Sequence, residues 1–149
     1  MMKKILIIFI LFLSQCGFQP IYLGKNFSMN EFNSISYEGD KEINQKIINS
    51  LSFKENQNNI NLDALLVKSS YRIIETKKNS SRKVESYKSL IEFNLIIKNK
   101  EKIITDKIFS KELSYDSKDN KFDLVQYQNK IKNDLINRII EDIILFLNI

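Results

Sequence analysis

The chain has 149 residues, of which 23 are lysine or arginine and 18 are aspartate or glutamate, for a formal net charge of +5. It contains no histidine, which excludes histidine acid–base catalysis, Ser-His-Asp triads and histidine-ligated metal sites. A single cysteine allows no intramolecular disulfide, and three glycines provide no glycine-rich phosphate loop. The length fits one domain, and the charge is too mildly basic to predict a nucleic-acid partner.

Residues 1–15 predict a lipoprotein signal peptide. Two lysines precede an unbroken apolar run from Ile5 to Leu13, which is too short to cross a bilayer as a helix. Cys16 follows where this run ends, as in the signals whose cysteine thiol receives diacylglycerol. After cleavage the new amine would receive a further acyl chain. Two or more chains give stable anchoring, since each buried methylene contributes about 0.8 kcal/mol.

An ordinary signal peptide with an incidental cysteine, or a short uncleaved anchor, is the alternative. Gln15 stands where lipoprotein signals usually carry glycine or alanine. A large residue there lowers the expected efficiency of cleavage before Cys16, but it does not change the position of the thiol. An acylated Cys16 would hold the chain at a membrane even without the cut. We therefore predict a lipidated N-terminus and tether over 16–31, and no cofactor other than these covalent lipids.

The pattern of apolar residues predicts the elements of a single domain over 32–149. Residues 32–37 alternate between apolar and polar side chains, which is typical of a half-buried strand. Asp40 suits a helix N-cap, and apolar residues at 43, 47 and 51 predict a helix that ends near residue 52. Three long strands are predicted over 62–76, 83–98 and 102–115. A change of apolar parity predicts a β-bulge in the last of them.

A helix over 122–147 is predicted to end the chain. Its last two turns are apolar nearly all round, so that end is either buried in its own core or in contact with a partner protein or lipid. The order of elements predicts an α+β fold, β-α-β-β-β-α. We expect a two-layer sandwich in which a four-stranded mixed sheet carries two helices on one face.

The opposite face of the sheet is predicted to be amphipathic and net basic. It carries five charged residues interrupted by four apolar ones: Lys68, Arg72, Lys88, Glu92 and Lys98, with Leu66, Ile74, Leu90 and Ile96. This face is either a solvated surface, or a site for an amphiphile with anionic head groups or for another protein.

The residues that follow the signal resemble a known family. The stretch Cys16-Gly17-Phe18-Gln19-Pro20-Ile21-Tyr22 is similar to the mature N-terminus of the lipopolysaccharide-assembly lipoprotein family LptE. The order of strands and helices resembles that family by pattern, as do the tyrosines of its strands, Tyr71 and Tyr87. The resemblance implies a lipid-anchored outer-membrane protein on the periplasmic side. Gly17 after the cysteine also fits outer-membrane sorting.

The same resemblance implies the partners. Members of the family lie inside the β-barrel of LptD, as a plug and as an assembly partner in the transport of lipopolysaccharide to the outer leaflet. The expected partners are thus an LptD-type barrel, lipopolysaccharide, and the outer membrane through the lipid anchor. Candidate lipopolysaccharide-binding residues are the basic side chains of one hairpin tip: Lys77, Lys78, Arg82 and Lys83. They suit the phosphates of lipid A, although a solvated turn is the alternative.

Two other functions stay open. Another outer-membrane lipoprotein, such as a pilotin or a barrel-assembly accessory subunit, would share the anchor and differ in its partner. A lipid-anchored enzyme would use carboxylates such as Asp106 and Glu112, whose spacing is unremarkable. We expect no enzyme activity, no catalytic residue and no metal site.

Overall fold

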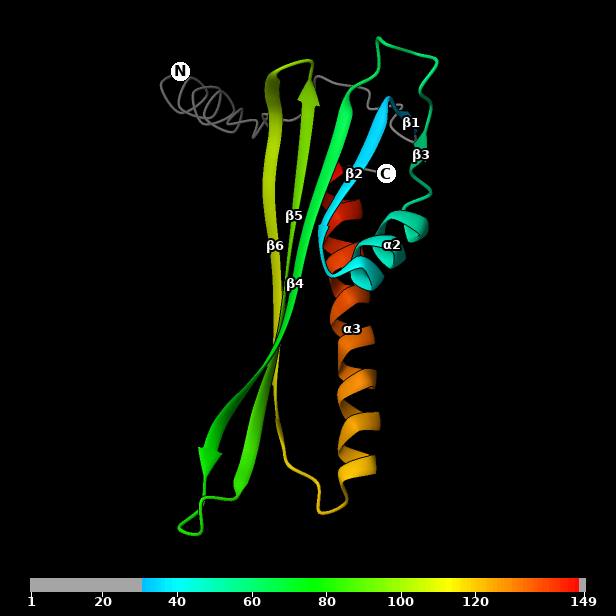
Figure 1. The fold of residues 1–149 in the computed structure, drawn as a ribbon. Coiled ribbons are helices and arrows are strands. Elements are labelled where there is room, and N and C mark those ends of the chain that lie inside the picture. The colour runs from blue at the N-terminus through cyan, green and yellow to red at the C-terminus, as the bar shows by residue number, and fades with distance from the viewer. Residues whose placement is uncertain (1–30, 148–149) are drawn as a thin grey trace, which may run out of the picture.

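A four-stranded sheet forms one layer of the fold and two helices form the other (Figure 1). The computed structural model describes residues 31–147. Its elements are β1 (Glu31–Phe32), β2 (Ser34–Gly39), α2 (Lys41–Ser50), β3 (Lys54–Glu55), β4 (Ala64–Lys78), β5 (Val84–Asn99), β6 (Lys102–Asp116) and α3 (Lys121–Leu147). The predicted signal peptide, Cys16 and nearly all of the predicted tether lie outside the described residues and stay predictions.

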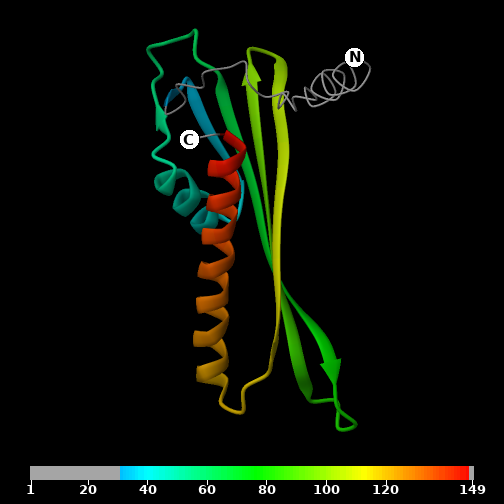
Figure 2. The same ribbon diagram turned by 180° about the vertical axis from the view of Figure 1, so that it is seen from behind.

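The sheet has the order β2-β4-β5-β6, in which β2 runs parallel to β4 and the other neighbours are antiparallel. Views from opposite sides show both helices on one side of this sheet (Figures 1 and 2). The α+β fold with two helices on one face of a mixed sheet is therefore confirmed. The core lies between the layers, where Ile43, Ile47, Phe93 and Leu135 are fully buried.

A second, very small sheet was not predicted. Strands β1 and β3 pair in parallel, with Glu31 opposite Lys54 and Phe32 opposite Glu55. The ring of Phe32 is buried and meets that of Phe53 edge to face, with centroids 5.1 Å apart. Residue 31, which we assigned to the tether, thus belongs to the folded part of the chain.

The junction between β2 and α2 depends on two adjacent residues. Gly39 has a φ of 83° and approaches β4 so closely that a Cβ there would lie 1.9 Å from the carbonyl oxygen of Ser69. Only glycine fits this backbone conformation in so little space. The next residue, Asp40, is the predicted N-cap, and its carboxylate accepts a hydrogen bond of 3.1 Å from the backbone N–H of Ile43.

The predicted β-bulge lies near the start of β6. Thr105 pairs with Ile97 and Ile103 pairs with Lys98, so Ile104 has no partner on β5. The extra residue lets Ile104 pack against the core, while Ile103 lies on the face without helices and is 51% exposed.

Strand β6 is an edge of the sheet, and two lysines point inward from it. Lys107 pairs with Leu95 and Lys111 pairs with Ile91, both of which face the helices. The ammonium of Lys107 lies 5.7 Å from the centre of the Phe146 ring, and that of Lys111 lies 2.7 Å from a carboxylate oxygen of Asp142. Inward charges of this kind protect a sheet edge from pairing with another strand.

The end of α3 packs mainly within its own fold. Ile143 and Leu147 are buried and Phe146 is partly buried, whereas Leu145 is 75% exposed. Burial in its own core therefore accounts for most of the apolar end of this helix. Among residues 31–147 there is no helix with the length and hydrophobicity needed to cross a membrane.

Candidate functional site

The predicted lipopolysaccharide-binding residues gather at the tip of the β4–β5 hairpin, at the opposite end of the molecule from β1 (Figure 1). Asn79 closes the tip, since its carbonyl accepts from the Arg82 N–H at 2.9 Å. Its side-chain oxygen accepts from the N–H groups of Ser81 and Lys83, at 3.0 and 2.9 Å. Arg82 has a φ of 62°, a conformation that favours glycine, which this turn lacks.

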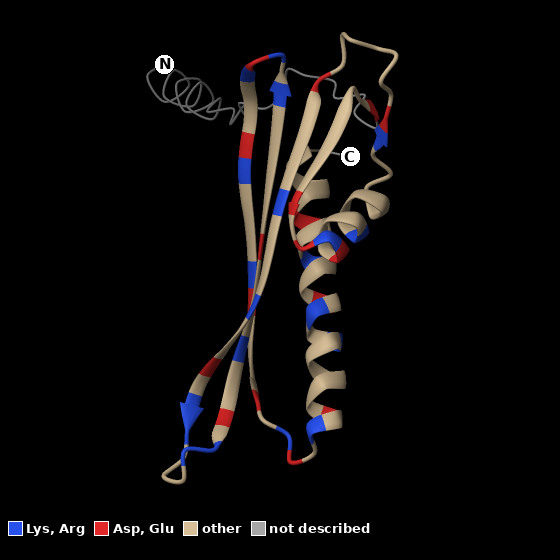
Figure 3. Ribbon diagram, in the orientation of Figure 1, with Lys and Arg blue, Asp and Glu red and all other residues tan. Residues whose placement is uncertain are grey.

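The structure brings the four basic residues to one tip but also gives three of them acidic neighbours (Figure 3). The three ion pairs are Lys77–Glu85 at 2.7 Å, Lys78–Glu75 at 2.8 Å and Lys83–Asp119 at 3.7 Å. Arg82 forms no ion pair with the carboxylates of residues 31–147. The sequence analysis missed these acidic partners, although Glu75 lies only three residues before Lys78 on the same strand.

The ion pairs keep the tip lysines charged. The hydrogen bond to Glu85 raises the pKa of Lys77, and the hydrogen bond to Glu75 raises the pKa of Lys78. Both pairs are exposed, and exposed ion pairs contribute little to stability because water and salt screen them. A phosphate can therefore replace the carboxylate partner at little cost to the fold.

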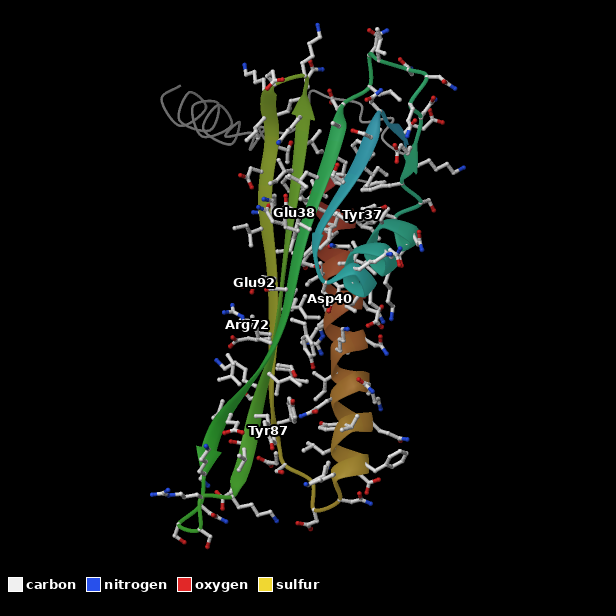
Figure 4. All side chains as sticks on the ribbon, viewed as in Figure 1. Tyr37, Glu38, Asp40, Arg72, Tyr87 and Glu92 are labelled. Atoms are coloured by element: carbon white, nitrogen blue, oxygen red, sulfur yellow. The ribbon has the colours of Figure 1, made fainter. Side chains whose placement is uncertain are left out.

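The helix-free face of the sheet carries the predicted residues, but its positive charge is balanced. Three cross-strand ion pairs cover it: Lys68–Glu38 at 2.8 Å, Arg72–Glu92 at 2.6 Å and Lys88–Glu112 at 3.4 Å. Figure 4 shows Arg72 and Glu92 side by side on the side of the sheet turned away from α3. The predicted net-basic charge of this face is thus corrected to paired charges, which do not attract anionic head groups preferentially. The face is amphipathic as predicted, since Ile74, Ile103 and Ile108 are exposed on it.

This face is hollowed where β2 leaves the sheet. Glu38, Lys68 and Glu92 border the hollow, and Ile108, 62% exposed, lies on its β6 side. Asn94 also lines it, and its side-chain oxygen has no hydrogen-bond partner among the described residues. The border of the hollow carries both positive and negative side chains.

The two carboxylates considered for an enzyme lie far apart. Asp106 and Glu112 are six residues apart on β6, which corresponds to about 20 Å along a strand. Paired carboxylates that act on one bond lie within about 10 Å of each other. Glu112 is also engaged by Lys88. Within residues 31–147, the acidic side chains form no group that could hold a metal ion.

A second basic cluster was missed by the sequence analysis. Lys98, Lys100 and Lys102 lie in and beside the turn between β5 and β6, at the end of the molecule opposite the hairpin tip (Figure 1). None of the three forms an ion pair with a carboxylate of residues 31–147. The alternation of lysine with other residues over 98–102 was the available signal.

No protein-family model matches the chain, and no curated protein matches it by sequence. Several solved structures share the fold. They include rare lipoprotein B from Shewanella oneidensis, with a TM-score of 0.55 and 10% identity over 74% of this chain and 92% of that chain. A protein from Caulobacter crescentus CB15, described as a candidate lipoprotein, has a TM-score of 0.52 and 10% identity over 77% and 88% of the two chains. A minor lipoprotein from Acinetobacter baumannii has a TM-score of 0.50 and 12% identity over 75% and 89%. The fold is therefore one found in bacterial lipoproteins.

Proposed function

We propose that the chain is a non-enzymatic outer-membrane lipoprotein of the LptE type, held on the periplasmic side by acyl chains on Cys16. In this proposal it plugs an LptD-type β-barrel and assists the transport of lipopolysaccharide to the outer leaflet. The observation that carries the proposal is the fold, which is shared with three bacterial lipoproteins over about three quarters of this chain. The position of Cys16 after a short apolar run supports the anchor.

The dimensions of the fold suit a plug. Strand β5 has 16 residues, which corresponds to a length of about 50 Å. The hydrocarbon core of a bilayer is about 30 Å thick, so a sheet of this length would extend beyond it on both sides. A sheet of four strands covered by a helical layer would require a wide barrel, of the class whose lumen is large enough to hold a plug.

The surface also suits the inside of a barrel. The inner wall of such a barrel is polar, since outward and inward residues alternate along its strands. The helix-free face presents three exposed cross-strand ion pairs, which can exchange partners with polar groups on a facing wall. Lipopolysaccharide would then meet the hairpin tip, where Arg82 and the three paired lysines could bind phosphates of lipid A.

The partner is tested by purifying the acylated full-length chain in detergent from its native outer membrane. We expect an LptD-type barrel to co-purify in stoichiometric amount. Recovery of a secretin or of a barrel-assembly complex instead would favour the pilotin or accessory-subunit alternative. Absence of an LptD-type barrel from the purified complex would contradict the proposal.

Charge reversal tests the lipid-binding tip. Arg82→Glu with Lys83→Glu should weaken lipopolysaccharide binding about tenfold or more, because each charge-assisted contact contributes about 1.5–3 kcal/mol. The difference from the unaltered chain should shrink at high salt, since the tip is exposed. Dissociation constants measured at two salt concentrations check this.

The matched control is Lys41→Glu with Lys130→Glu, which makes the same charge change at exposed helix positions away from the tip. This control should bind lipopolysaccharide nearly as well as the unaltered chain. Equal weakening in both variants would mean that only net charge matters and that the tip is a solvated turn.

A further inference from the structure

The end of the molecule opposite the hairpin tip is formed by a loop and a turn. The loop is residues 56–62, between β3 and β4, and the turn is residues 98–102, between β5 and β6. Figures 1 and 2 both show these segments at the end where β2 begins. The side-chain amide of Asn99 donates to a carboxylate oxygen of Asp63 at 2.7 Å, which joins the turn to the end of the loop. We call the two segments together the anchor-end surface.

The loop is fastened to the residues at which the described chain begins. The backbone N–H of Asn56 donates to the carbonyl of Phe32 at 2.8 Å, and the Asn56 side chain donates to Glu31 at 3.0 Å. The side chain of Asn33 donates to the carbonyl of Asn59 at 3.3 Å. The anchor-end surface therefore lies beside the point from which the chain leads back to Cys16.

The loop has a composition that tolerates contact with lipid. No side chain in 56–62 is charged, and two turns fold it on itself, since Asn59 N–H donates to Asn56 O and Leu62 N–H donates to Asn59 O, each at 3.2 Å. Ile60 is 82% exposed, more than any other large apolar residue that the structure describes. A single exposed isoleucine is ordinary on a soluble surface, so Ile60 by itself does not indicate a contact with lipid.

The charges of the anchor-end surface differ from those of the hairpin tip. Lys98, Lys100 and Lys102 meet no carboxylate in an ion pair within residues 31–147, whereas Lys77 and Lys78 at the tip are each paired. The same turn holds Glu101, between Lys100 and Lys102, so the anchor-end surface has three lysines against one carboxylate and a net charge of +2. Each lysine held near an anionic bilayer surface favours binding about fivefold.

We infer that the anchor-end surface docks on the anionic surface of the bilayer that holds the acyl chains of Cys16, with Ile60 in the interface and the three lysines toward lipid phosphates. The inference rests on the proposed acylation of Cys16. Even fully extended, residues 16–30 reach no more than about 50 Å, so the anchor keeps this end close to the bilayer. Contacts too weak to bind membranes alone suffice at such a high effective concentration.

The test places a fluorescent probe on the acylated full-length chain in vesicles that contain phosphatidylglycerol and a lipid with a nitroxide headgroup. Asn58→Cys carries the probe in the loop, and Ser80→Cys carries it at the hairpin tip. Cys16 is blocked by its lipid, so each variant has one reactive thiol. We expect the nitroxide to quench the probe at 58 at least threefold more strongly than the probe at 80.

Two changes should reduce the quenching at position 58 by half or more: Ile60→Asn, and Lys100→Gln with Lys102→Gln. Lys121→Gln with Lys130→Gln makes the same charge change on α3 and should leave the quenching unaltered. Equal quenching at 58 and 80 would overturn the inference. So would quenching at 58 that neither the Ile60 variant nor the double lysine variant reduces. A third outcome would also overturn it. If the probe at 58 is not quenched in vesicles and is shielded only when a barrel protein is present, a protein and not the bilayer is the occupant.

The acyl chains are measured first by mass spectrometry, which separates the two proposals. An acylated chain whose loop is not quenched contradicts the docking and leaves the proposed function intact. A chain without acyl groups on Cys16 contradicts the proposed anchor and the docking with it.

Discussion

Lys132 connects three elements of the fold through one side chain. Its ammonium lies 2.7 Å from Glu42 and 3.5 Å from Asp40, at the start of α2, and 5.4 Å from the centre of the Tyr71 ring on β4. The side chain is only 14% exposed. The sequence places Lys132 on the polar side of a predicted helix, but it gives no hint of carboxylates that lie about ninety positions away.

Lys132→Met should lower the free energy of unfolding by about 1–2 kcal/mol, because it leaves two carboxylates without their shared cation. Urea unfolding followed by circular dichroism measures the loss. Lys130→Met changes an exposed lysine of the same helix and should alter stability by no more than about 0.5 kcal/mol. A loss of the same size in both variants would show that the contacts of Lys132 do not contribute to the free energy of unfolding.

The contribution of Lys132 should depend on pH in one direction. Partial burial lowers the pKa of Lys132, but the hydrogen bond to Glu42 and the charges of Asp40 and Glu42 outweigh it, so the pKa is raised above 10.5. A raised pKa in the folded state stabilises the fold fully below the ordinary value, and this stabilisation is lost as the pH rises through the folded value. The difference between the unaltered chain and Lys132→Met should stay constant from pH 7 to 9.5 and shrink above 10.5.

At the scale of elements, the sequence predicts the helices, strands, cap and bulge that the local spacing of residue types determines. The two helices, four of the six strands, the cap at Asp40 and the bulge beside Ile104 follow from local spacing, and the structure confirms them. Strands β1 and β3 have two residues each, too few for any alternation to show. The acidic partners on the helix-free face depend on strand register, as for Glu38 opposite Lys68, and spacing alone does not provide it.

Gly39 is the residue on which the path from β2 to α2 depends. Gly39→Ala should lower the midpoint of thermal unfolding by about 8 °C or more, because the new Cβ meets the Ser69 carbonyl and the φ of 83° disfavours a side chain. Ser36→Ala, on the same strand, should shift the midpoint by no more than about 2 °C. Similar midpoints for Gly39→Ala and the unaltered chain would contradict the close approach described here.

At the scale of the whole molecule, the fold has two different ends. The described residues begin at one end, beside unpaired lysines, and the opposite end is a hairpin tip whose three lysines are paired and whose Arg82 is not (Figure 3). The sequence predicts a basic tip, but it does not distinguish paired from unpaired lysines. Whether a lysine is paired depends on which carboxylates the fold brings beside it. In the proposed arrangement, the tip is the part of the molecule that lies farthest from the acylated Cys16.

Cys16→Ser should abolish the incorporation of labelled palmitate and release the chain from the membrane fraction, since no other cysteine exists to carry the lipid. Gln15→Ala keeps the thiol and should retain the label, with cleavage at least as complete as in the unaltered chain. Palmitate incorporated equally by Cys16→Ser would show that the chain is not a lipoprotein.

The inward lysines of β6 restrict how this molecule can join a partner. A sheet edge normally accepts another strand through its backbone, and a barrel is made entirely of strands. Lys107 and Lys111 would have to give up their contacts with Phe146 and Asp142 before a fifth strand could settle beside β6. A barrel that encloses this fold is therefore not expected to add a strand at β6, and would contact this edge of the sheet through side chains.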